Sequence, residues 1–159
     1  MFTRISIIVL SASVFFTLTL DNVFASFIDH PVHSDKWTDK YDRHFKKYSK
    51  RYFGPLFDWH WFKAQAIAES ALSHDAESHV GARGLMQIMP FWLDELGRPD
   101  DNLFDINTNL RFGCTILNIY LDREKGDMRK ALARYNGSVG QNWYPQRVYK
   151  ALRKTWYPQ

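Results

Sequence analysis

One acidic residue lies inside an otherwise apolar helical run, and this run constrains the chain more than any other stretch. The residues from Phe62 to Leu72 are mostly small or apolar and predict a helix. At 3.6 residues per turn, Glu69 falls on the same sector as Phe62 and Ala66. Desolvation by apolar neighbours raises the pKa of a carboxyl group, as a general acid near neutral pH requires. An isolated helical glutamate is more often solvated or salt-bridged, so periodicity alone leaves both interpretations open.

The residues that follow this helix predict a loop that folds back across the helix end. The segment from Ser73 to Gly84 is polar and small, and an apolar run then leads to Pro90. Gly81 and Gly84 suit a backbone that turns tightly and approaches another group closely. The region around Glu69 therefore combines an acid with a closely folded loop.

The beginning of the chain has the pattern of a signal peptide, residues 1–25. A short basic start is followed by an apolar stretch from Ile5 to Leu20, and Val23-Phe24-Ala25 offers a cleavage site after Ala25. An uncleaved anchor is the alternative, although the apolar stretch is short for a membrane span of about 20 residues. We therefore expect an exported protein that is periplasmic or in the cell envelope after cleavage.

The remaining residues, 26–159, have the length of one domain. The formal net charge is +4, and outside the cytoplasm a basic protein meets an anionic wall or membrane surface rather than nucleic acid. Cys114 is the only cysteine, so it forms no internal disulfide and is expected in the core. We expect a monomer.

The segment 26–57 is expected to hold a leader and one amphipathic helix. His30 and His33 lie in the leader, but neither cysteine nor carboxylate completes a ligand spacing, so we expect no metal and no cofactor. Between residues 37 and 53, aromatic rings recur at helical spacing opposite a basic face. These rings belong to Trp37, Tyr41, Phe45, Tyr48 and Tyr52. A core-facing helix is favoured, and a surface helix on acidic lipid or wall polymer is the alternative.

The rest of the chain predicts further helices and an all-α domain. Asp58 is expected to cap the helix that carries Glu69, and Asp127 the helix from Met128 to Tyr135. Other helices are expected at 90–97, at 105–123 and from Pro145 onward. The fold class is therefore all-α, with at most a very small non-helical or β piece near residues 78–87.

Three separated motifs resemble those of a known family. They are Glu69-Ser70, then Ser78 with the run from Gly81 to Pro90, and then the run from Ala131 to Asn136. In this order they resemble the soluble lytic transglycosylases, a family of lysozyme-like proteins. The resemblance implies a lysozyme-like catalytic domain at 58–159 with a groove for peptidoglycan glycan strands. It also implies cleavage between N-acetylmuramic acid and N-acetylglucosamine, leaving a 1,6-anhydromuramoyl end.

The resemblance also implies roles for individual residues. Glu69 matches the catalytic glutamate, and Tyr135 resembles the family tyrosine whose hydroxyl faces that glutamate. The family positions that bind substrate are matched by Ser78, Gln87, Met89 and Asn136. The chain departs from the family pattern at His74, where proline is common, and at Gly137.

The chemistry of a single carboxyl supports the same activity independently. Most glycosidases use two carboxylates, but Asp75 and Glu77 lie in a polar loop and only Glu69 has an apolar setting. One carboxyl suffices where the 2-acetamido group of the substrate supplies the second function. The prediction is a peptidoglycan lytic transglycosylase. The alternatives are a hydrolytic muramidase of the goose-lysozyme type and a non-catalytic peptidoglycan-binding component of an envelope-spanning secretion or assembly machine.

Overall fold

The computed structural model describes residue 39 and residues 41–156. The predicted signal peptide, the leader at 26–36 and Trp37 lie outside the described residues. Within them the chain forms six helices and no strand, which confirms the all-α prediction. The helices are α2 (Asp42–Phe53), α3 (His60–Ser70), α4 (Phe91–Glu95), α5 (Ile106–Arg123), α6 (Met128–Asn136) and α7 (Trp143–Trp156). None of these helices is long and apolar enough to cross a membrane.

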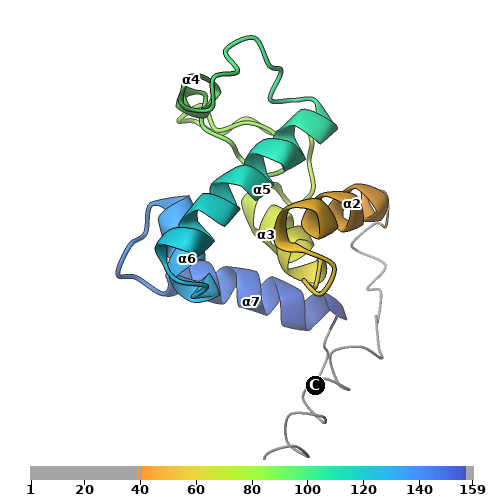
Figure 1. Cartoon of the computed structure of the whole chain (residues 1–159), viewed down its shortest axis with the longest axis vertical. Helices are drawn as coiled ribbons and strands as arrows, with labels where there is room; N and C mark the ends of the chain where they lie inside the picture. The colour runs from red at the N-terminus through yellow and green to blue at the C-terminus, as the bar shows by residue number, and fades with distance from the viewer. Residues whose placement is uncertain (1–38, 40, 157–159) are drawn as a thin grey trace, which may run out of the picture.

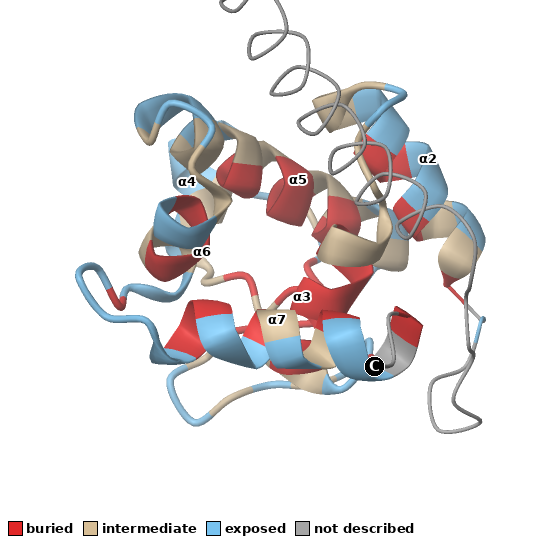
Figure 2. Cartoon of the chain, turned by 90° about the horizontal axis from the view of Figure 1, so that it is seen from below, coloured by how far each residue is buried: buried red, intermediate tan, exposed pale blue. Residues whose placement is uncertain are grey.

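Helix α5 runs through the middle of the molecule, with α4 and its flanking loops at one end and α7 at the other (Figure 1). Helix α3 packs chiefly against α7, while α5 packs against α6 and α2. The buried residues of α3, α5 and α7 face the interior that these helices share (Figure 2). Helix α3, which carries Glu69, is thus enclosed by the rest of the fold.

Helix α3 is buried along most of its length rather than on one face. All residues from Phe62 to Ala68 are buried, including the charged Lys63. A buried ammonium group requires a partner, and Lys63 forms an ion pair with Asp42 of α2 beside the Trp156 ring. The sequence predicted an apolar sector around Glu69, and the structure surrounds most of the helix with protein.

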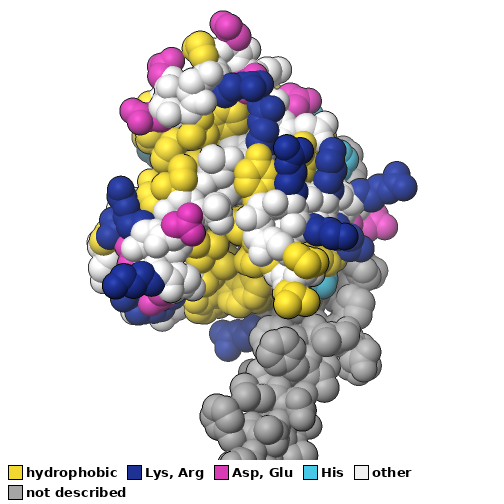
Figure 3. All heavy atoms as spheres, viewed as in Figure 1, with side chains coloured by type: hydrophobic (Ala, Val, Ile, Leu, Met, Phe, Trp, Pro, Cys, Tyr) yellow, Lys and Arg dark blue, Asp and Glu magenta, His cyan; other side chains and the backbone are white. Residues whose placement is uncertain are grey.

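The aromatic stripe of α2 faces the core, as predicted. Tyr41, Phe45 and Tyr48 are buried, and the Phe45 ring meets the Phe62 ring edge-on at a centroid distance of 5.6 Å. Lys and Arg side chains gather on the outer side of the molecule where α2 lies (Figure 3). The core-facing interpretation of this helix is therefore confirmed.

One expected helix start is confirmed and another needs correction. The Asp58 carboxylate accepts from the His60 N–H at 3.0 Å in the first turn of α3, which is the bond of a capping residue. Trp59 between them already has helical dihedrals, with φ of −60° and ψ of −18°. The last helix starts at Trp143 rather than Pro145. A proline fits in the first turn of a helix because the N–H it lacks would have no partner there.

The predicted cap of α6 is confirmed, since Asp127 accepts from Lys130 N–H at the start of that helix. Asp105, for which the sequence analysis proposed no cap, accepts from Thr108 N–H at the start of α5. The small β piece is also present, as two isolated bridges that join Arg83 to Glu77 and to Ile88. These bridges shape the loop that follows α3.

Candidate functional site

The end of α3 determines where the Glu69 carboxyl lies. Glu69 is the penultimate residue of α3, and the Ala71 N–H closes the helix on the Ile67 carbonyl at 3.0 Å. Ala71 and Leu72 then both have left-handed backbone, with φ of 53° and 65°. Two successive non-glycine residues in this region are unusual and costly. They turn the chain sharply just after Glu69, so that the following loop returns beside the acid.

Glu69 has an electrostatic setting suited to proton transfer near neutral pH. Glu69 is half-buried, and desolvation of its carboxyl raises the pKa to about 7. The hydrogen bond from Tyr144 and the charge of Arg147 lower this pKa without cancelling the desolvation. Both protonation states are therefore accessible near pH 7, so the group can donate a proton and take one back.

Tyr144 of α7 holds the Glu69 carboxyl directly. Its hydroxyl donates to Glu69 Oε1 at 2.5 Å, and its side chain is almost fully buried. Burial raises the pKa of Tyr144 well above its usual range, and the Glu69 charge raises it further, so the hydroxyl remains a donor. The sequence analysis did not identify Tyr144. The sequence signal was an apolar or aromatic residue at every fourth position, and all four are buried in the structure: Tyr144, Val148, Leu152 and Trp156.

Tyr135 lies near Glu69, but its hydroxyl makes a different hydrogen bond. The hydroxyl donates to the Met86 carbonyl at 3.0 Å. Burial raises the pKa of Tyr135 well above its usual range, and the charge of Glu69 adds to this effect. The structure thus brings Tyr135 toward the acid through the loop backbone, and its catalytic role stays a prediction.

Met86 is fixed by contacts from two helices, α5 and α6. Its N–H donates to Asn109 Oδ1 of α5 at 2.8 Å, and Tyr135 of α6 donates to its carbonyl. Its side chain lies over Gly113, where an added Cβ would stand 2.7 Å from Met86 Cγ. Only glycine accommodates so close an approach. The loop beside Glu69 is therefore positioned by the packed helices and not by its own sequence alone.

Asn109 is the central anchor of this loop. It is almost fully buried, and its Nδ2 donates to the Arg83 carbonyl at 2.8 Å and the Leu103 carbonyl at 2.7 Å. Ser70, next to Glu69, adds a bond from α3, since its hydroxyl donates to the Leu85 carbonyl at 2.9 Å. The sequence analysis assigned no role to either side chain.

The predicted substrate-binding residues Ser78 and Gln87 both hold the loop in this structure. The Ser78 hydroxyl accepts from Ala82 N–H at 3.0 Å. Gln87 has a left-handed φ of 48°, and its Nε2 donates to the carbonyls of Ala76 at 3.2 Å and Gly84 at 3.0 Å. These bonds give both side chains a structural task, and contact with substrate remains a prediction.

The other two predicted substrate residues lie at the borders of helices. Met89 is half-buried and directly precedes Pro90 at the start of α4, and Asn136 is exposed as the last residue of α6. Gly137 follows with a φ of 81° and closes α6 in the left-handed conformation. Asn136 is thus available to a ligand at the surface.

The two acids nearest to Glu69 in the loop have a different environment. Asp75 and Glu77 are exposed, and Glu77 pairs with Arg83 at 3.1 Å. The Asp75 carboxylate accepts from the Ser73 hydroxyl at 2.5 Å. Neither has the desolvated setting of Glu69, so the site offers one general acid.

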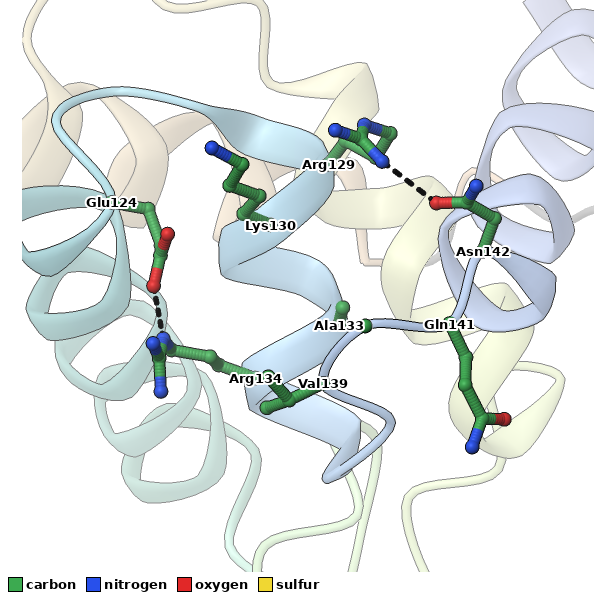
Figure 4. Close-up of a pocket in the computed structure, with 9 residues that line it drawn as sticks. Glu124, Arg129, Lys130, Ala133, Arg134, Val139, Gln141 and Asn142 are labelled. Carbon is green, nitrogen blue, oxygen red and sulfur yellow. Dashed lines mark hydrogen bonds and ion pairs between the residues drawn. The ribbon is translucent and has the colours of Figure 1, made fainter.

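A hollow of about 220 Å³ lies elsewhere, between α6 and the loop that leads to α7. Its cations are engaged with neighbours (Figure 4): Arg134 pairs with Glu124, and Arg129 donates to Asn142 Oδ1 at 2.8 Å. Neither Glu69 nor a tyrosine is among its lining residues. The Glu124 carboxyl in its lining is held in an ion pair with Arg134, so we place the chemistry at Glu69.

The fold and site define a helical domain with one desolvated carboxyl that a buried tyrosine holds. A sequence model of the transglycosylase SLT domain matches residues 45–156. The chain belongs to this family. A transglycosylase of Enterobacteria phage PRD1 is 39% identical over 91 residues, which cover 53% of this chain and 33% of that protein.

Solved structures of similar fold belong to lytic transglycosylases. An inactive Glu-to-Gln mutant of lytic transglycosylase Slt from Pseudomonas aeruginosa has a TM-score of 0.56 and 26% identity over 72% of this chain and 18% of that one. The 70-kDa soluble lytic transglycosylase from Escherichia coli has a TM-score of 0.54 and 28% identity over 75% of this chain and 19% of that one. A 70-kDa soluble lytic transglycosylase in complex with bulgecin A has a TM-score of 0.56 and 25% identity over 75% of this chain and 21% of that one. The lysozyme-like fold prediction is confirmed, and this chain spans about a third or less of the length of these relatives.

Proposed function

We propose that this protein is a peptidoglycan lytic transglycosylase whose general acid and base is Glu69. The observation that carries the proposal is the pKa of Glu69 near 7, which burial produces while the Tyr144 hydroxyl fixes the carboxyl. Asp101 and Asp127, in contrast, are partly exposed acids whose pKa is lowered by cationic or backbone partners. Membership of the SLT family supports the same substrate class.

In the proposed reaction, protonated Glu69 donates its proton to the glycosidic oxygen between N-acetylmuramic acid and N-acetylglucosamine. The bond from muramoyl C1 to that oxygen breaks, and the 2-acetamido group stabilises the electron-poor C1. Glu69, now a carboxylate, takes the proton from the muramoyl 6-hydroxyl as O6 bonds to C1. The products are a free 4-hydroxyl and a 1,6-anhydro ring, no water is consumed, and Glu69 is protonated again.

The supporting roles follow from where the chain places each residue. Tyr144 orients the carboxyl of Glu69, and Tyr135 holds the loop beside it through Met86. Ser78, Gln87, Met89 and Asn136 are proposed to line the path of the glycan. We further propose that residues 1–25 direct export, that residues 58–159 form the catalytic domain, and that the protein acts as a monomer in the periplasm, where an envelope-spanning machine is a candidate partner.

Mass spectrometry of soluble fragments from digested peptidoglycan tests the proposal. Fragments with anhydromuramoyl ends, lighter by one water than reducing ends, are expected with the wild-type protein and absent with Glu69→Gln. Reducing muramic ends would replace the proposal with a hydrolytic muramidase. No fragments from a folded protein would favour a glycan-binding function.

Replacing Tyr144 by phenylalanine is expected to raise the pKa of Glu69 by about one unit, because a hydrogen bond to a carboxylate contributes about 1.5 kcal/mol or more. The wild-type rate should fall above about pH 7, where Glu69 loses its proton. In Tyr144→Phe this alkaline limb should move upward, and the maximal rate should drop about tenfold as the carboxyl loses its orientation. The measurement is the pH dependence of kcat/KM on purified peptidoglycan.

Two further tyrosine variants serve as comparisons. Tyr135→Phe removes the bond to the Met86 carbonyl and should lower the rate with a smaller shift of the alkaline limb. Tyr149→Phe, on the same helix as Tyr144 with its ring against Trp61, should keep the wild-type profile. An unshifted limb in Tyr144→Phe would contradict the role of Tyr144.

A further inference from the structure

A buried glutamine lies one helical turn before Glu69, and the proposed reaction does not use it. Gln65 is on α3, four residues ahead of Glu69, and it is completely buried. Residues four apart on a helix share a face, so the two side chains project from the same side of α3. That side packs against α7, which carries Tyr144.

The Gln65 amide has no hydrogen bond partner among the described residues. Neither its nitrogen nor its oxygen lies in hydrogen-bonding geometry with another group. A buried amide without partners costs about 1–3 kcal/mol of stability. A methionine or leucine would fill the same volume without this penalty, so stability does not account for a glutamine here.

The group on which the Gln65 amide acts is the Tyr144 hydroxyl. Burial and the Glu69 charge raise the pKa of Tyr144, and the Gln65 amide opposes them, as a donor directed at the phenolic oxygen does. The packing of α3 against α7 and the bond from Tyr144 to Glu69 place the Tyr144 hydroxyl on the side of α3 from which Gln65 projects. The Gln65 amide does not form a hydrogen bond with it in this structure. The same Tyr144 hydroxyl donates its proton toward Glu69 Oε1.

We propose that Gln65 is a positioning residue that donates its amide N–H to the Tyr144 oxygen and so keeps the Tyr144 hydroxyl directed at Glu69. A phenolic oxygen that accepts one bond becomes a stronger donor through its own O–H, because hydrogen bonds in a chain polarise one another. The relay stabilises the carboxylate form of Glu69. It thereby sets the upper pH limit at which Glu69 still acts as an acid, and this inference extends the proposed function of the same site.

The other titratable groups around Glu69 do not replace this relay. Arg147 of α7 acts on Glu69 by charge alone, and Tyr135 of α6 donates to the Met86 carbonyl. Cys114 and Tyr120 of α5 act on Tyr135. Among these groups, Tyr144 is the one that both contacts Glu69 and is acted on by Gln65.

The test is the titration of Glu69, followed by the carbon-13 shift of its carboxyl group in glutamate-labelled protein. In Gln65→Met the midpoint should rise by about half a unit, since a neutral hydrogen bond contributes about 0.5–1.5 kcal/mol. In Tyr144→Phe, adding Gln65→Met should shift the midpoint no further, because the relay is already broken. Gln146→Met, the same change at an exposed position of α7, should leave the midpoint unchanged.

Thermal unfolding of the same variants separates positioning from a purely structural role. Gln65→Met should unfold near the wild-type temperature, since loss of the proposed bond to Tyr144 is offset by removal of a buried amide oxygen. An unchanged Glu69 midpoint in Gln65→Met, or an equal shift in the Tyr144→Phe background, would overturn the proposal. The titration needs no turnover, so an inactive protein with the expected shifts would refute the proposed function and leave the relay intact.

Discussion

Glu69→Gln is expected to abolish glycan cleavage while making the folded protein more stable at neutral pH. The amide has nearly the volume of the carboxyl but transfers no proton. A general acid contributes about 10²–10⁴-fold, and here the same group also acts as the base, so the loss should be at least about a thousandfold. Release of soluble fragments from peptidoglycan measures the loss. Glu77→Gln, an exposed acid of the neighbouring loop, is the matched control and should retain activity.

The stability of Glu69→Gln should depend on pH in a defined direction. The pKa of Glu69 rises from 4.5 to about 7 on folding, so between these values the folded state binds more protons than the unfolded state. The free energy of unfolding of the wild type therefore falls as the pH rises through this window. Because one pKa unit corresponds to about 1.4 kcal/mol, the difference above pH 7 is about 3 kcal/mol.

Denaturant unfolding of wild type and Glu69→Gln at pH 4 and pH 8 checks this sign. The two proteins should have similar free energies of unfolding at pH 4, where the carboxyl is protonated in both states. At pH 8 the variant should be more stable by about 3 kcal/mol. Equal stabilities at pH 8 would show that the carboxyl is not desolvated, and would remove the basis for a general acid at this position.

Asn109→Ala is expected to lower the free energy of unfolding by about 3–5 kcal/mol. The change removes three hydrogen bonds and leaves the Met86 N–H and the Arg83 and Leu103 carbonyls without their partner. A buried group that loses its partner costs about 1–3 kcal/mol, and a cavity adds to this. Denaturant unfolding measures the loss, and Asn118→Ala, the same change elsewhere on α5, should cost far less.

Activity provides a second observation for Asn109→Ala. Because Asn109 holds the loop beside Glu69 and does not contact the acid, cleavage should fall even at temperatures where the variant remains folded. The pH of the alkaline limb should stay near that of the wild type. A variant as stable as Asn118→Ala would contradict the central position that we give to Asn109.

The sequence predicted the acid but not the group that holds it. Glu69 was identified because a carboxyl within an apolar helical run is unusual, and the run from Phe62 to Leu72 alone shows it. Tyr144 was missed because it lies 75 residues away and because Pro145 suggested a helix that starts after it. Once the helix is seen to start at Trp143, Tyr144 joins the buried stripe of α7.

Sequence patterns also did not predict the roles of the buried polar side chains near the site. Asn109 and Gln65 are polar residues inside helices whose burial depends on which helices pack against them. Periodicity places a residue on a face, but it does not state which loop or helix that face meets. The cap Asp127 was predicted correctly because its bond is local, whereas Ser70 was given no role because its bond to Leu85 spans the loop.

The long-range bonds to Met86 and Glu69 determine when in folding the proposed acid becomes oriented. Tyr135 reaches back 49 residues to the Met86 carbonyl, and Tyr144 reaches back 75 residues to the Glu69 carboxyl. Contacts between such distant positions form only after most of the core has assembled, because closing long loops is unfavourable until packing rewards it. A nascent or partly unfolded chain therefore carries Glu69 without an oriented carboxyl. The orientation of the proposed acid is therefore gained late in folding, which links the proposed activity to a complete fold.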